Sequence, residues 1–167
     1  MLLDDVSKIV NLKHAWEFIL NKNVILSDTN FSLLCEINKL VEEGFYYSAG
    51  KIRTVQVSIS GTNWTPDFPI ESIIKEELND IINKQISDID KAIELLLYVM
   101  KKQIFIDGNK RTSIIFANHY LISKGKGIIV IPVKLIDEYK DLLINYYEGK
   151  DKTKIKKFLK EKCFMKI

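Results

Sequence analysis

The sequence predicts a mainly α-helical domain that carries one short β-hairpin. Of its 167 residues, 47% are hydrophobic, whereas glycine (7) and proline (3) are scarce, and this composition favours helices. Apolar residues recur at helical spacing along most of the chain, and one segment, residues 51–60, is instead rich in β-branched residues. A chain of this length is expected to form a single domain over residues 1–167.

Two helices are expected in the N-terminal part of the chain. Leu12, Trp16 and Ile19 recur at helical spacing within residues 1–27. A second helix is expected to begin with Asp28 or Thr29 as its N-cap and to end near residue 44, a glycine.

Residues 53–65 are expected to form a β-hairpin, or flap. Val55, Val57 and Ile59 alternate with Gln56 and Ser58, which is the spacing of a half-buried strand. A Gly-Thr-Asn turn follows at residues 61–63, and the prolines at 66 and 69 block continuation into a helix.

The second half of the chain is again helical in pattern. Helices are expected over residues 70–83 and 88–102, then from the polar interruption at 107–109 through Ser123. Residues 128–131 are expected to be a short strand or extended segment, followed by two last helices over roughly 134–147 and 151–162.

Charge and cysteine usage exclude several classes of protein. A net charge of +3 does not favour a nucleic-acid partner, and the basic tail (150–166) is interpreted as a solvated helix face. Two distant cysteines resemble neither a disulfide framework nor a zinc site. With no signal-like start and no apolar run of about 20 residues, no membrane partner is expected, and the expected location is cytoplasmic.

The stretch Gln103–Thr112 (QIFIDGNKRT) has the composition of an anion site at the start of a helix. Helix N-termini expose unpaired N–H groups and the positive end of the dipole, so they bind phosphate. Gly108 lets the backbone approach an anion closely, and Arg111 adds a guanidinium that can bind two oxygens at once. Asp107 is the candidate ligand for Mg²⁺ held against phosphate oxygens.

Ordinary helix capping is the alternative interpretation of the same residues. An Asp-Gly-Asn sequence at 107–109 can cap a helix whose first turn then carries two exposed basic residues. From these residues alone, the two interpretations stay open.

The stretch resembles the motif of the Fic/Doc family, His-x-Phe-x-(Asp/Glu)-(Gly/Ala)-Asn-(Gly/Lys)-Arg. Phe105 and residues 107–111 fill their positions in it. The resemblance continues upstream through residues 49–53 (AGKIR) and 61–66 (GTNWTP), and downstream at Asn118 and Leu121. It covers roughly residues 30–162.

This resemblance implies a mainly α fold with a central motif-bearing helix beside a flap. It implies ATP and Mg²⁺ as cofactors, with phosphates bound by Gly108, Asn109, Lys110 and Arg111 and the metal by Asp107. It further implies transfer of AMP to a hydroxyl of a target protein, which docks by strand addition along residues 55–59. A separate antitoxin-like inhibitor is a further partner that the resemblance implies.

The position of the family's catalytic histidine is occupied by Gln103. A neutral amide is no general base near pH 7, and a positioned base contributes about 10²–10⁴ in rate. Gln103 can still orient a hydroxyl by hydrogen bonding.

Two further departures concern the phosphate site. Lys110 replaces the glycine common in members that transfer AMP and matches the Doc branch, in which the γ-phosphate is transferred. Ile114 replaces a second arginine, and the inhibitory pattern (Ser/Thr)-x-x-x-Glu-(Gly/Asn) is absent, so built-in inhibition is not expected.

Two hypotheses therefore remain after the sequence is read. The first is an enzyme that transfers AMP, or phosphate as Doc does, with Gln103 orienting the acceptor. The second is a catalytically impaired module that binds a nucleotide or a protein.

Overall fold

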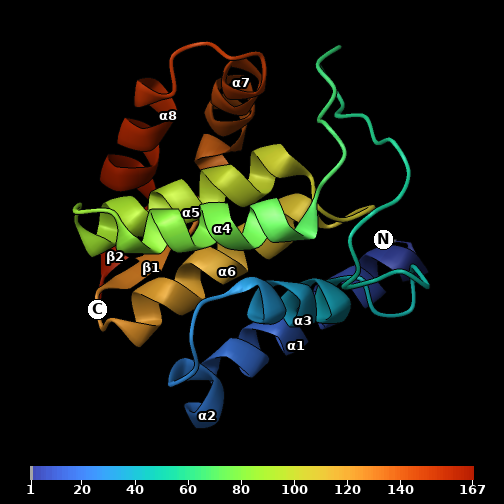
Figure 1. Cartoon of the computed structure of the whole chain (residues 1–167), viewed down its shortest axis with the longest axis horizontal. Helices are drawn as coiled ribbons and strands as arrows, with labels where there is room; N and C mark the ends of the chain where they lie inside the picture. Colours follow the sequence, from blue (N-terminus) through green and yellow to red (C-terminus); the bar gives the residue numbers. More distant parts are fainter. Residues whose placement is uncertain (1) are drawn as a thin grey trace.

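The computed structural model describes residues 2–167 and is mainly α-helical, as predicted. Figure 1 shows α5 and α6 side by side through the middle of the molecule, with α1 and α3 on one side and α7 and α8 on the other. In chain order the elements are α1 (Leu3–Leu20), α2 (Lys22–Ile25), α3 (Phe31–Val41), α4 (Glu71–Asn83), α5 (Asp88–Lys102), α6 (Asn109–Ser123), β1 (Gly127–Ile129), a 3₁₀ turn (Val133–Leu135), α7 (Ile136–Tyr147), α8 (Thr153–Phe158), a π-helical turn (Leu159–Cys163) and β2 (Phe164–Lys166).

Helix α6 is the central helix, and it is buried on nearly every side. Its buried residues include polar ones, which a buried helix tolerates only when they are hydrogen-bonded. His119 contacts Thr29 Oγ1 through Nδ1 at 2.8 Å and the Val24 carbonyl through Nε2 at 2.7 Å. Both ring nitrogens are thus engaged, and burial lowers the pKa of His119, so this histidine is a neutral packing residue.

Asn118 joins α6 to the small sheet. Its Nδ2 donates to the Ile129 carbonyl at 2.8 Å and its Oδ1 accepts from Ile129 N at 2.7 Å. Ile129 thereby lies fully buried at the end of β1, which pairs antiparallel with β2 in the register Gly127↔Lys166. The predicted extended segment at 128–131 is therefore a strand that begins one residue earlier and ends at 129.

The hairpin prediction for residues 53–65 requires a correction. The segment runs out and back as extended chain, turning at Ser60 and Gly61, and among the described residues the only strand pairing is that of β1 with β2. Figure 1 shows it within the long connection from α3 to α4, at the right of the view. Alternation of Val55, Val57 and Ile59 predicted extended backbone correctly, but side chains rather than a ladder hold the two limbs together.

Arg53 is the side chain that holds both limbs. It is only 2% exposed, and its guanidinium donates to the carbonyls of Gln103 (2.5 Å), Val55 (2.9 Å) and Asp67 (2.6 Å). Gln56 adds a bridge from its Nε2 to the Pro66 carbonyl at 2.9 Å. One buried cation thus fixes both limbs of the loop to the C-terminal end of α5.

Replacing Arg53 by methionine should destabilise the protein by about 3 kcal/mol, because the buried carbonyl of Gln103 and the part-buried carbonyls of Val55 and Asp67 lose their donor. Urea unfolding measures the change, with Lys51→Met, an exposed neighbour, as the matched loss of one positive charge. Equal stability of the two variants would show that Arg53 does not hold the loop.

Candidate anion-binding site at the start of helix α6

The turn between α5 and α6 is closed by Asn109. Its Oδ1 accepts from Phe105 N at 3.0 Å, and its Nδ2 donates to the Phe105 carbonyl at 2.8 Å. Ile104 and Phe105 are buried beneath the turn. The Asn of the motif therefore shapes the loop with its side chain, and only its backbone N–H is directed along the helix start.

Gly108 occupies the N-cap position of α6 in a left-handed conformation with φ 73°. A Cβ there would collide with the carboxylate of Glu42, so both conformation and space require glycine. The first intrahelical bond runs from Thr112 N to the Gly108 carbonyl at 2.8 Å, so the N–H groups of residues 109–111 precede it. These are the unpaired donors that the sequence predicts for an anion.

Arg111 forms an ion pair with a carboxylate at the C-terminal end of another helix. Its Nη2 lies 2.7 Å from Oε1 of Glu42, which directly follows α3 and is 1% exposed. Burial raises the pKa of Glu42 above its ordinary value, although the neighbouring Arg111 opposes that rise. Glu42 Oε2 and Arg111 Nη1 are both buried without a hydrogen-bond partner in the structure, so this ion pair leaves two polar atoms unsatisfied.

Gln103 is held as a structural residue. It ends α5 in the left-handed conformation (φ 47°, ψ 58°), which no other non-glycine residue adopts in the described part of the chain. Its Nε2 donates to the Met100 carbonyl at 2.6 Å, and its Oε1 accepts from Asn109 Nδ2 at 3.2 Å. The side chain is 8% exposed, so one amide hydrogen and one lone pair remain for a ligand.

A cavity of about 230 Å³ lies between this turn and the loop. It brings Gln103 together with Asp107 and with residues 108–111 of α6, and residues 58–60 of the loop form the opposite wall. Lys110 also lines it; desolvation, with repulsion from Lys140 added, lowers the pKa of Lys110.

Most of the residues predicted to dock a target protein, 55–59, lie away from the cavity. Val55, Gln56 and Val57 do not line the cavity, and Gln56 is turned towards Pro66. Val55 is 51% exposed, so its side chain is available at the surface. Ile59, by contrast, is buried, so it anchors the loop as well as lining the cavity.

Asp107 is the one carboxylate among the residues that line the cavity, so it is the candidate ligand for Mg²⁺. Its Oδ1 accepts from Gly108 N at 2.7 Å, and the residue lines the cavity. No cluster of three or more His, Cys, Asp or Glu side chains with ligand geometry occurs within residues 2–167. Mg²⁺ here would need phosphate and water as its other ligands, as is common for this ion.

Sequence reasoning missed Glu42 and Asn38, which approach the site from α3. Asn38 Nδ2 donates to the Asp107 carbonyl at 3.0 Å, and its Oδ1 accepts from Gly50 N at 2.8 Å. Both residues continue the buried face of α3 that Leu34, Ile37 and Val41 define. Polar residues at i and i+4 on an otherwise apolar face were the signal that would have found them.

None of the helices formed by the described residues is long and apolar enough to cross a bilayer.

Comparison with known proteins agrees with this architecture. The chain is similar to a segment of Fic-1 from C. elegans, with 21% identity, a TM-score of 0.74, and coverage of 96% of this chain and 48% of that one. It is also similar to a Fic domain-containing signaling protein from Bacteroides thetaiotaomicron, with 19% identity, a TM-score of 0.69, and coverage of 86% and 58%. This chain thus spans about half the length of the solved chains it matches. No curated protein sequence matches it closely enough to count as a relative.

The sequence profile of the family described as "Fic/DOC family" matches residues 28–121, which include α3, the loop, α4, α5 and most of α6. The profile covers more than half of the chain, and the matched structures share its fold. The chain belongs to the Fic/DOC family.

Proposed function

We propose that this chain binds the phosphate groups of a nucleotide, with Mg²⁺, at the N-terminus of α6, and that any transfer of AMP or phosphate from it is slow. The observation that carries the proposal is the convergence of three kinds of group on one cavity. The unpaired N–H groups of residues 109–111, the cation Lys110 and the carboxylate of Asp107 all belong to residues that line it. Family membership supports a nucleotide as the source of the phosphates.

The ligand's phosphate has to compete with Glu42 for the guanidinium of Arg111. The pair is 2.7 Å apart, and the Arg111 side chain is 28% exposed, so one edge of the guanidinium can reach a ligand. Nη1 has no partner but is buried, so a phosphate oxygen would bind at the exposed part of the side chain unless the surrounding residues move.

Slow transfer follows from the chemistry of Gln103. In either transfer the hydroxyl oxygen of a target attacks phosphorus, pyrophosphate or ADP leaves, and the hydroxyl proton has to pass to a base. The amide of Gln103 cannot accept that proton, and its two hydrogen bonds restrain it against the turn. Positioning of the hydroxyl by its remaining lone pair is the contribution left to it.

A protein transferase is the second candidate function, and Lys110 favours its phosphate-transferring form. The lysine places a cation in the cavity where the family's AMP-transferring members carry glycine. A target would dock beside the cavity along residues 55–59, where extended backbone has no strand partner among residues 2–167. A separate protein that covers the same backbone would act as an antitoxin-like inhibitor.

Incubation of the protein with α- and γ-labelled ATP and Mg²⁺ in a lysate distinguishes these functions. The wild type is expected to label targets weakly with either nucleotide, and Gln103→His to increase labelling by about 10²-fold or more. Gln103→Asn is the matched control without a base. If Gln103→His gains nothing and calorimetry detects no nucleotide binding to either protein, the proposal fails.

Arg111→Ala should weaken binding of ATP by about 1.5–3 kcal/mol, the scale of one charged hydrogen-bonding contact. Isothermal titration calorimetry measures this loss. Because the variant also leaves Glu42 buried without its cation, Glu42→Gln/Arg111→Ala serves as control for a general disturbance of the site. Unchanged affinity in both variants would remove Arg111 from the phosphate site.

Glu42→Gln should strengthen ATP binding at pH 7.5 by about fivefold, because a neutral amide competes less well for Arg111. The pKa of Glu42 is raised, so its proton is gained on acidification before that of an ordinary glutamate. The advantage of the variant should therefore shrink as the pH falls towards the range of that raised pKa. Calorimetry at pH 7.5 and 5.5 measures both affinities, and comparison at each pH cancels protonation of the nucleotide itself. A constant ratio of affinities would contradict the competition.

A further inference from the structure

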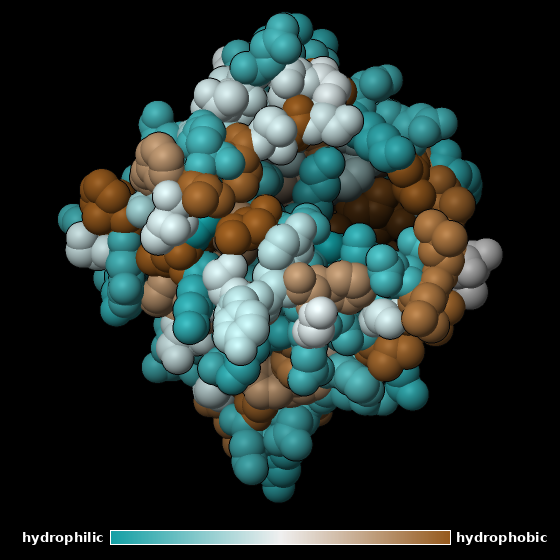
Figure 2. Space-filling view, turned by 90° about the vertical axis from the view of Figure 1, so that its right-hand side faces the viewer, coloured by the Kyte–Doolittle hydropathy of each residue, from teal (hydrophilic) through white to brown (hydrophobic). Residues whose placement is uncertain are grey.

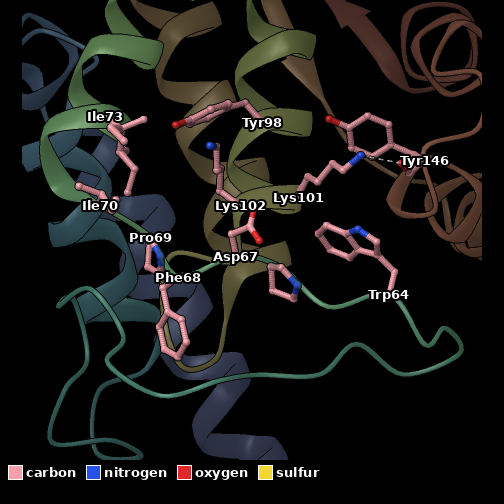
Figure 3. A pocket seen from close by; sticks show the side chains of 12 residues that line it. Trp64, Asp67, Phe68, Pro69, Ile70, Ile73, Tyr98, Lys101, Lys102 and Tyr146 are labelled. Atoms are coloured by element: carbon pink, nitrogen blue, oxygen red, sulfur yellow. Dashed lines mark hydrogen bonds between the residues drawn. The ribbon is translucent and has the colours of Figure 1, made fainter.

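A second cavity, of about 360 Å³, shares no lining residue with the anion site. It is formed between α4, the C-terminal end of α5, Tyr146 of α7 and the returning limb of the loop. Its volume falls in the range of small-molecule sites. Figure 2 shows hydrophobic surface gathered around a hollow on one face of the molecule, and Figure 3 shows the side chains of this cavity from close by.

Aromatic side chains form much of its wall. Trp64 and Phe68 come from the loop, Tyr98 from α5 and Tyr146 from α7. Trp64 is held in place by stacking on Tyr147, with ring centroids 5.8 Å apart and an interplanar angle of 6°. Phe68 is 57% exposed, and Arg53 lies over one face of its ring, with the guanidinium carbon 5.5 Å from the ring centroid. Such a wall fits a planar aromatic group.

Two of the charged side chains on the cavity are left without an opposite partner. Lys102 pairs with Glu77 at 2.9 Å. Lys101 instead donates to the Tyr146 carbonyl at 3.2 Å and lies over the rings of Trp64 and Tyr146. Asp67 has no ion pair within the described residues, and Figure 3 shows its carboxylate on the loop beneath the two lysines of α5.

The position of Asp67 is fixed by its backbone. Its carbonyl accepts from Arg53 Nη2 at 2.6 Å, so the loop residue that presents the carboxylate is tied to the core. Lys101 is likewise positioned on the last turn of a buried helix. An unpaired anion and an unpaired cation are therefore presented together at one aromatic cavity, and the charges on a complementary ligand are the reverse.

We propose that this cavity binds a small aromatic zwitterion, an amino acid of the phenylalanine class. The ligand's ring lies among the aromatic side chains of the wall, beside Trp64, its carboxylate pairs with Lys101 and its ammonium pairs with Asp67. This inference is independent of the nucleotide proposal, since it uses no residue of the α6 site.

Fluorescence of Trp64 provides the test, because the chain has two tryptophans and Trp16→Phe leaves Trp64 alone. In that background, titration with L-phenylalanine is expected to change the emission in a saturable way at concentrations up to about 10 mM. 3-Phenylpropionate, which lacks the ammonium, and phenethylamine, which lacks the carboxylate, should each bind about tenfold more weakly.

Two variants test whether Asp67 contacts the ammonium of the ligand and Lys101 its carboxylate. Asp67→Asn should lose the preference for L-phenylalanine over 3-phenylpropionate, and Lys101→Met should lose the preference over phenethylamine. Glu76→Gln on α4 and Lys154→Met on α8 are exposed controls that should keep both preferences. Circular dichroism verifies that each variant folds.

Each remaining result overturns the proposal. Absence of saturable binding of L-phenylalanine to the folded protein, confirmed by calorimetry, excludes the site. Equal binding of the three compounds excludes the zwitterion and leaves an unselective apolar cavity. Retention of both preferences in Asp67→Asn and Lys101→Met places the ligand elsewhere.

Discussion

The arrangement of the whole site depends on one buried guanidinium. Arg53 pairs with no carboxylate of the described residues; instead, carbonyl oxygens from three separate segments of chain accept its N–H groups. Burial lowers its pKa, but an arginine remains charged far above neutral pH. One of these carbonyls belongs to Gln103 and another to Asp67, so the same side chain sets the distance between the anion cavity and the aromatic cavity. Lysine could not replace it, because a single ammonium lacks the planar fork that reaches several acceptors.

Most of the helical architecture could be predicted from the sequence, because each helix carries local signals. The α5 pattern of Ile93, Leu96, Leu97 and Met100 matches a buried face, and the polar turn at 107–109 marked the start of α6. The motif residues were also found in advance, since their order along the chain is itself the signal. Their gathering on one cavity agrees with that expectation, whereas their roles in binding remain predictions.

What the sequence could not supply were the contacts between distant segments. Residues 55–59 were predicted to be a paired strand because apolar and polar residues alternate there. This alternation indicates extended backbone, but no local pattern shows whether a partner strand exists. The inhibitory pattern did not predict the role of Glu42, because that pattern is defined by residues that are close together in the sequence. Its contact with Arg111 joins residues 69 positions apart and arises from packing of α3 against α6. Gln103 was correctly identified as a substitution, but its left-handed backbone and its bonds to Met100 and Asn109 are visible only in three dimensions.

The internal carboxylate of Glu42 also bears on selectivity. A bare pocket of N–H donors and a free arginine would attract chloride, sulfate and every phosphorylated metabolite, in a protein with a formal net charge of +3. With Glu42 already on Arg111, a simple anion gains little, because it has to displace a partner that is tethered in place. Only a ligand with further contacts, such as a metal ion on Asp107 or a group along the loop, offsets that loss. Under the proposed function, the ion pair is expected to act as a threshold that rejects weak anions, since discrimination depends on the difference between affinities.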